Sequence, residues 1–168
     1  MPLTLEDGSV VSGADTYVSR ADFITYAASK GVTVADEAAS DVYLFKAAQY
    51  IDHHESGLKG DKTTRDQAMS YPRANLVLDG FTWDSDEIPR QVILCQQELA
   101  LDLIAGIDIW NRPQSKSQGV KRQRVEGAVE VEYAVGDGMR LSRQSSSIAL
   151  LNSLLRNSGL LSVAISMG

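Results

Sequence analysis

The histidines of this 168-residue chain stand side by side as His53 and His54. Adjacent side chains on a helix project in different directions, so this pair is poorly placed to hold one metal ion. Both lie where a helix is expected to end, and the helix dipole there favours a positively charged imidazole. We therefore interpret the pair as a helix C-terminus and predict no metal site from it.

A second group with possible chemistry is a set of carboxylates around Gly80, namely Asp79, Asp84, Asp86 and Glu87. The set lacks the ligand spacing and the closing glutamate of an EF-hand calcium loop. Asp86 and Glu87 also suit the N-terminus of a helix that begins near Pro89, where negative charge is favoured. Calcium binding is the weaker of these two interpretations, and we expect no metal or other cofactor.

Nucleophilic catalysis finds no support in the sequence. The single cysteine, Cys95, lies inside an apolar helical run, where a buried thiol behaves as a small hydrophobic side chain. No serine has nucleophile-elbow flanks, and Gly136-Asp137-Gly138 is a turn signal that lacks the strand and helix of a dinucleotide site. We therefore expect a protein that is not an enzyme.

The strongest nucleic-acid signal is the basic run Lys121-Arg122-Gln123-Arg124. Two strands are predicted here, Val120–Val125 and Ala128–Val135, joined at Glu126-Gly127, and the second strand is acidic. Pairing across this hairpin explains the basic run without DNA. A net charge of -6 also opposes phosphate binding, so DNA contact is the alternative interpretation.

Four helices are predicted to position these residues: 20–30, 36–54, 89–105 and 146–156. Ser19 with Asp22 begins the first and Gly31 ends it. The second shows one apolar line, formed by Val42, Phe45, Ala48 and Ile51. The third is apolar around most of its circumference, with Gln91, Glu98 and Asp102 as a polar strip, so it should be central or covered by neighbouring chains.

The connection 55–87 is long for a compact domain, and a short helix is predicted within it at about Thr64 to Met69. The predicted fold is mainly α: a small helical bundle with a long central helix, a β-hairpin insertion and extended terminal arms. Residues 1–18 form an N-terminal arm, residues 19–158 the helical domain with the hairpin at about 120–135, and residues 159–168 an apolar tail. No run is long and apolar enough to span a bilayer, and Met1–Val10 has no apolar signal core, so production in the cytosol is expected.

Several motifs, in order from Leu5 to about Leu155, resemble the head-to-tail connector or adaptor proteins of tailed phages, which are often labelled DnaT-like single-stranded DNA-binding proteins. The motifs are Glu6-Asp7-Gly8, Ala14 to Ser19, Gln67 to Arg73, Gly80, Ile88-Pro89 and Val129 to Tyr133. The chain departs from that family in Tyr71, where tryptophan is common, and in its apolar tail.

The resemblance implies a structural subunit of a homo-oligomeric ring, usually a dodecamer, which docks under the portal protein in the virion neck and binds a tail-side stopper, collar or tail-terminator protein. Genomic DNA would pass through the ring without sequence-specific binding, and assembly would take place in the host cytoplasm. The alternative is a DnaT-like replication protein that binds single-stranded DNA. Contacts with the portal or a neighbouring subunit are expected from Tyr71, Pro72, Arg73, Arg122, Arg124, Leu160, Leu161, Val163, Ile165 and Met167.

Overall fold

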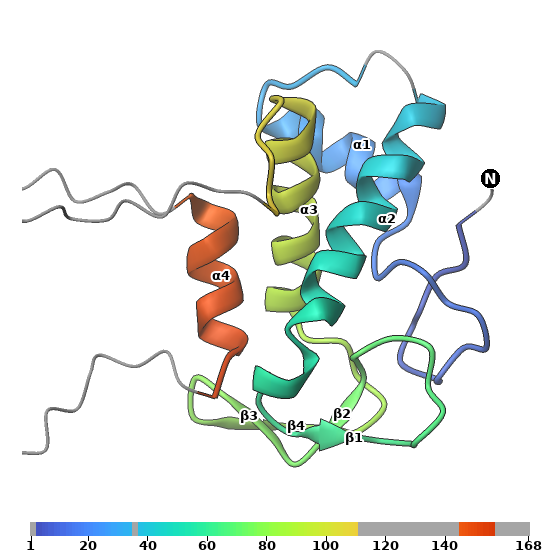
Figure 1. Cartoon of the computed structure of the whole chain (residues 1–168), viewed down its shortest axis with the longest axis vertical. Helices are drawn as coiled ribbons and strands as arrows, with labels where there is room; N and C mark the ends of the chain where they lie inside the picture. The colour runs from blue at the N-terminus through green and yellow to red at the C-terminus, as the bar shows by residue number, and fades with distance from the viewer. Residues whose placement is uncertain (1–2, 35–36, 111–144, 157–168) are drawn as a thin grey trace, which may run out of the picture.

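The computed structural model describes residues 3–34, 37–110 and 145–156 (Figure 1). These residues are mainly helical and also contain two small antiparallel sheets, which confirms the mainly-α prediction at this level. In chain order the elements are α1 (Arg20–Ser29), α2 (Glu37–His53), the 3-10 turn η1 (Glu55–Gly57), β1 (Asp61–Lys62), β2 (Arg73–Ala74), β3 (Leu76–Leu78), β4 (Phe81–Trp83), α3 (Arg90–Ile104) and α4 (Ser146–Leu154). The predicted hairpin at about 120–135 and the tail 159–168 lie outside the described residues.

Helix α3 is the centre of the fold. It packs against α1, α2 and α4, and it runs between α2 and α4 in Figure 1. Val92, Cys95, Leu99 and Ala100 of α3 are fully buried. The prediction of a central apolar helix is therefore confirmed, and the covering helices come from the same chain. Within the described ranges, no helix has the length and hydropathy that crossing a membrane requires.

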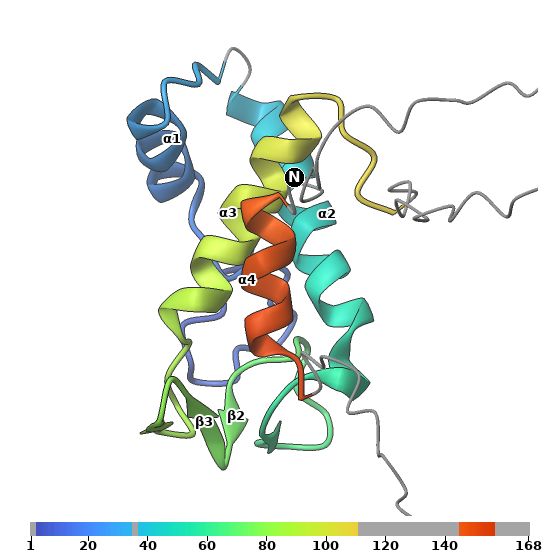
Figure 2. The same cartoon turned by 90° about the vertical axis from the view of Figure 1, so that its left-hand side faces the viewer.

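Helix α4 packs against α3 (Figure 2), and it meets Glu98 and Asp102 of the predicted polar strip. Ser147 Oγ donates to Asp102 Oδ2 at 2.6 Å, and Ser146 Oγ donates to Glu98. Lys30 Nζ lies 2.8 Å from Glu98 Oε1, so this carboxylate also ties α1 to α3. Burial alone would raise the pKa of Glu98, but the hydrogen bonds from Lys30, Ser146 and Tyr26 outweigh it and the pKa is lowered. Carboxylates that meet the N-terminus of α4 also complement its dipole.

Helix α1 begins as its sequence predicts. Ser19 is the N-cap, and its hydroxyl accepts from Asp22 N at 3.2 Å. Gly31 follows the helix with a φ of 75°, a conformation that glycine adopts without steric cost. Local capping signals were therefore sufficient to place both ends of this helix.

The segment between α2 and α3 differs from its prediction. It folds into two hairpin-like strand pairs, and the predicted short helix at Thr64 to Met69 is wrong, because turns and bends occupy those residues. The Gln67 side chain accepts from Thr64 N at 3.0 Å and donates to the carbonyl oxygens of Met69 and Pro72. These bonds satisfy backbone groups in a non-helical conformation and so compete with a helix.

The N-terminal segment packs against the helices. The Glu6 carboxylate accepts hydrogen bonds from the backbone of Gly8, Val10 and Val11 at 2.8 to 2.9 Å, which folds the chain into a compact loop. Tyr17 and Val18 are buried in the core. The residues described from position 3 onward thus pack against the helical domain.

Candidate nucleic-acid interface

Helix α2 turns a different face inward from the one its sequence predicts. Ala48 and Ile51 are buried as expected, but Leu44 and Ala47 complete the core face. Val42 is 51% exposed and Phe45 36% exposed, so this half of the predicted apolar line faces solvent. Apolar residues surround most of α2, and periodicity alone does not choose between its faces.

The exposed side chains along this outer side follow helical spacing, and we call them the α2 face: Val42, Phe45, Lys46, Gln49 and His53. None of the exposed α2 side chains that the structure describes is a carboxylate. The carboxylates of this helix at positions 41 and 52 turn inward, where Asp41 binds Arg20 and Asp52 binds Tyr17. In a chain with a net charge of -6, this face is therefore locally neutral to basic.

Trp110 extends the α2 face at its C-terminal end. Its ring lies 5.1 Å from Tyr50 and 5.4 Å from His53, centroid to centroid, and both contacts are edge-to-face. The neighbouring Ile109 is buried to 1% exposure and anchors the segment after α3, while Trp110 itself remains 48% exposed. Aromatic rings held in this way can stack on nucleic-acid bases.

His54 completes the aromatic group but not as a metal ligand. Its Nδ1 lies 2.8 Å from the carbonyl oxygen of Tyr50, and its ring lies 4.9 Å from the Tyr50 ring. Across residues 3–34, 37–110 and 145–156, no three His, Cys, Asp or Glu side chains are grouped to hold a metal ion. Cys95 is buried, and burial, followed by the charge of Glu98, raises the pKa of its thiol to about 12.

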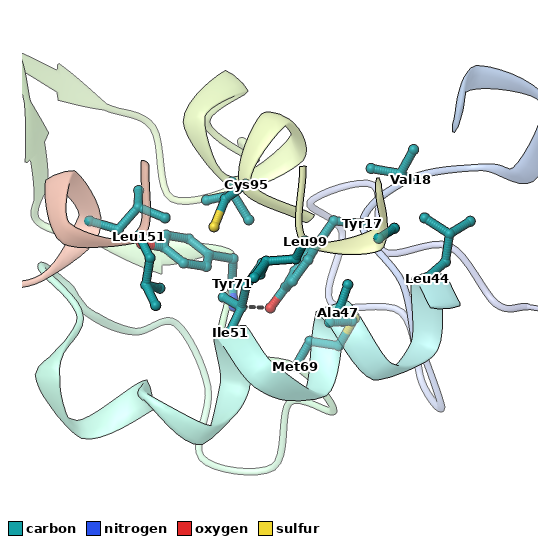
Figure 3. Close-up of a cluster of buried hydrophobic side chains, with 14 of the residues drawn as sticks. Tyr17, Val18, Leu44, Ala47, Ile51, Met69, Tyr71, Cys95, Leu99 and Leu151 are labelled. Carbon is teal, nitrogen blue, oxygen red and sulfur yellow. Dashed lines mark hydrogen bonds between the residues drawn. The ribbon is translucent and has the colours of Figure 1, made fainter. Parts of the chain in front are cut away.

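Asp52 connects α2 to two distant segments behind the α2 face. Its Oδ1 accepts from the Tyr17 hydroxyl at 2.8 Å and from Ser70 N at 3.0 Å. The Tyr17 hydroxyl in turn accepts from Tyr71 N at 3.2 Å (Figure 3). Burial raises the pKa of Asp52, although the hydrogen bonds from Tyr17 and Ser70 offset part of the increase. These hydrogen bonds fix α2 against the N-terminal segment and the loop before β2.

Replacing Asp52 with asparagine should change how stability depends on pH. The folded protein holds the Asp52 proton more tightly than the unfolded chain, so the stability that this group contributes is complete below its ordinary pKa of 3.8 and is lost as pH rises through the raised folded-state pKa. Asparagine keeps an acceptor oxygen and cannot ionise. The free energy of unfolding of Asp52→Asn, minus that of the wild type, should therefore increase from pH 4 upward in urea titrations. A constant or decreasing difference would contradict the prediction.

The residues expected at an interface divide into two sets. The structure places Tyr71, Pro72 and Arg73 inside the protein's own core, with Tyr71 fully buried and Arg73 5% exposed. Arg73 donates to the carbonyl oxygens of Ser70 and Gly60 at 3.1 and 3.2 Å, so its charge serves the local fold. The other residues lie outside the described part of the chain: Arg122, Arg124, Leu160, Leu161, Val163, Ile165 and Met167. An interface role for either set stays an untested prediction.

Sequence reasoning missed the α2 face and Trp110. One signal could have indicated them: α2 contains more apolar positions than one buried face requires, and those of its exposed positions that the structure describes lack acidic residues. Trp110 also directly precedes residues 111–124, which contain five Lys or Arg residues and no Asp or Glu.

Comparison with known proteins identifies a family. The model of the family described as "Putative DnaT-like ssDNA binding protein" matches residues 1–166, nearly the whole chain. The chain belongs to this family. No curated protein and no solved structure matches it.

This family match corrects the function first inferred from the sequence. The connector interpretation, with its ring, portal and tail-side partners, is contradicted because the matching family is a DnaT-like single-stranded DNA-binding family and not a virion structural one. The family match instead favours the alternative interpretation, a DnaT-like protein that binds single-stranded DNA.

Proposed function

We propose that this protein binds single-stranded DNA through the α2 face and Trp110, and that its role is binding and not catalysis. The observation that carries the proposal is the half-exposed Trp110, held edge-to-face by Tyr50 and His53 at the end of a helix face whose described exposed side chains include no carboxylate. Proteins that bind single strands without sequence preference combine aromatic stacking platforms with a basic path for the backbone. The chain belongs to a family described as binding single-stranded DNA, and this membership also favours single-stranded DNA as the ligand.

The charge distribution explains how an acidic protein can bind a polyanion. Lys46 and His53 lie on the α2 face, and five basic residues follow Trp110 in the sequence: Arg112, Lys116, Lys121, Arg122 and Arg124. Asp108 is the nearest carboxylate in sequence to Trp110, and its Oδ1 accepts from Trp110 N at 2.9 Å. Bases would stack on the aromatic side chains while the phosphates follow the basic residues, so binding should weaken as salt rises.

Replacing Trp110 with alanine tests the proposal. Stacking of one base on an aromatic ring contributes about 1–3 kcal/mol, so Trp110→Ala should weaken binding about 5- to 150-fold. The measurement is fluorescence anisotropy with a labelled oligothymidine at low salt, repeated at higher salt. Arg122→Ala/Arg124→Ala should weaken binding and reduce the salt dependence.

The matched control is Phe81→Ala. Phe81 is 73% exposed and aromatic but belongs to β4, which is part of neither α2 nor the segment of Trp110, and Asp79 and Asp84 are near it in sequence. Its replacement should leave the affinity unchanged. No binding by the wild type at low salt, or equal losses in Trp110→Ala and Phe81→Ala, would overturn the proposal. Circular dichroism establishes that each variant is folded.

A further inference from the structure

A groove of about 560 Å³ lies between the N-terminal loop and the turn that leads from β4 into α3. The two segments touch at Gly8, which has a φ of 106°; a Cβ at this position would lie 1.9 Å from the backbone oxygen of Asp86. Only a glycine permits this approach. The apolar part of the lining comes from Leu5, Tyr17, Val18, Trp83, Ile88 and Ile93.

The rim of this groove is strongly acidic. Asp7, Asp22, Asp86 and Glu87 line it and are exposed, and no Lys or Arg is among the described residues that line it. Asp7 and Asp22 bond the hydroxyls of Ser9 and Ser19. The side chains of Asp86 and Glu87 make no such bond with any residue that the structure describes, so their charges are available to a ligand.

Trp83 adds an observation that does not depend on charge. Its Nε1 is buried and has no hydrogen-bond partner among the described residues. A buried N–H without an acceptor is costly, and a ligand that brings a carbonyl oxygen would remove that cost. The groove therefore combines an apolar wall with an anionic rim, and one of its lining residues, Trp83, holds a buried donor without a partner among the described residues.

We propose that this groove binds a basic peptide segment of a partner protein. Lys or Arg side chains of the segment would lie against Asp86 and Glu87, an apolar side chain would contact Leu5 and Ile93, and a peptide carbonyl would accept from Trp83 Nε1. Charge complementarity identifies this occupant, because a nucleic acid would be repelled by the same rim. The inference does not rest on the proposed DNA binding, which uses the α2 face.

A synthetic peptide of ten residues that alternates arginine and leucine is a suitable probe. With the peptide labelled by fluorescein, anisotropy at physiological salt should show binding, and Asp86→Asn/Glu87→Gln should weaken it about three- to tenfold. Trp83→Phe, which keeps an aromatic ring without the donor, should weaken binding about two- to tenfold. In a Trp110→Phe background Trp83 is the remaining tryptophan, and its emission should change when the peptide binds.

The control variant is Asp66→Asn/Asp79→Asn, which removes two exposed carboxylates outside the groove. It should bind the peptide within about twofold of the wild type, as expected when distant surface charges are screened. Absence of binding by the wild type, equal losses in the two double variants, or equal binding of a glutamate–leucine peptide would overturn the proposal. Oligonucleotide affinity should be equal in the two double variants, so failure here is distinguishable from failure of the DNA-binding proposal.

Discussion

Replacing Gln96 with alanine should lower the free energy of unfolding by about 3–5 kcal/mol, among the largest effects expected from one substitution in this protein. Gln96 lies in the middle of α3 and is fully buried. Its Oε1 accepts from Tyr17 N at 2.9 Å, and its Nε2 donates to Thr16 Oγ1 at 2.8 Å and to the Leu44 carbonyl oxygen at 2.9 Å. One amide therefore joins the N-terminal segment, α2 and α3.

The physical reason for the large effect is that two costs add. Alanine leaves the buried Tyr17 N–H without its acceptor, and it also leaves a cavity where the amide was. Gln96→Leu separates these costs, since leucine nearly fills the volume but makes no hydrogen bond, and its loss should be about 1–3 kcal/mol. Urea titrations with comparable m-values provide the measurement. If Gln96→Ala lies within 1 kcal/mol of the wild type, the amide is not the connection that the geometry indicates.

Replacing Tyr71 with alanine should also lower the free energy of unfolding by about 3–5 kcal/mol, whereas Tyr71→Phe should leave it unchanged or raise it by about 1 kcal/mol. The Tyr71 ring is fully buried and packs edge-to-face on Tyr17, with ring centroids 6.2 Å apart (Figure 3). The Arg73 guanidinium lies 5.9 Å from the ring centroid. Alanine removes these contacts and leaves a large cavity.

The different expectation for phenylalanine follows from the hydroxyl of Tyr71. That oxygen is buried and has no hydrogen-bond partner among the described residues. Burial raises the pKa of Tyr71, and the nearby Arg73 offsets only part of that increase, so the hydroxyl stays protonated. Removing an unpaired buried hydroxyl should not destabilise the fold. Thermal and urea unfolding of the two variants test the contrast, and a loss above 2 kcal/mol in Tyr71→Phe would show that the hydroxyl has a partner.

The helices could largely be predicted from the sequence. Ser19 with Asp22 and Gly31 placed α1, and Pro89 placed the start of α3, because capping depends on residues close in sequence. One local signal was overlooked: Asp79 and Gly80 have φ values of 53° and 83° and form the tight turn between β3 and β4. An Asp-Gly pair between apolar residues is a recognised hairpin signal.

The candidate interface was much harder to predict from the sequence. The basic run at 121–124 was identified, and the family match supports the DNA-binding alternative attached to it. Two residues of the α2 face, Val42 and Phe45, were instead placed on one apolar line with Ala48 and Ile51, because they satisfy the same helical spacing as these buried residues. Trp110 became a candidate only through its contacts with Tyr50 and His53, which are more than 50 residues away in sequence.

The sequence by itself therefore determined the helical composition and the helix ends, because these follow from local capping and from the amount of apolar surface that a helix must bury. For α3 it required burial on most sides, and the structure showed that helices of the same chain provide it. Only the tertiary structure decided which side of α2 faces solvent, that Tyr71-Pro72-Arg73 lies in the core, and that Gln96, Glu98 and Asp102 join distant segments. The physical reason is that a polar or aromatic side chain is buried only where a partner from elsewhere in the chain satisfies it, and that partner is set by packing and not by neighbouring residues.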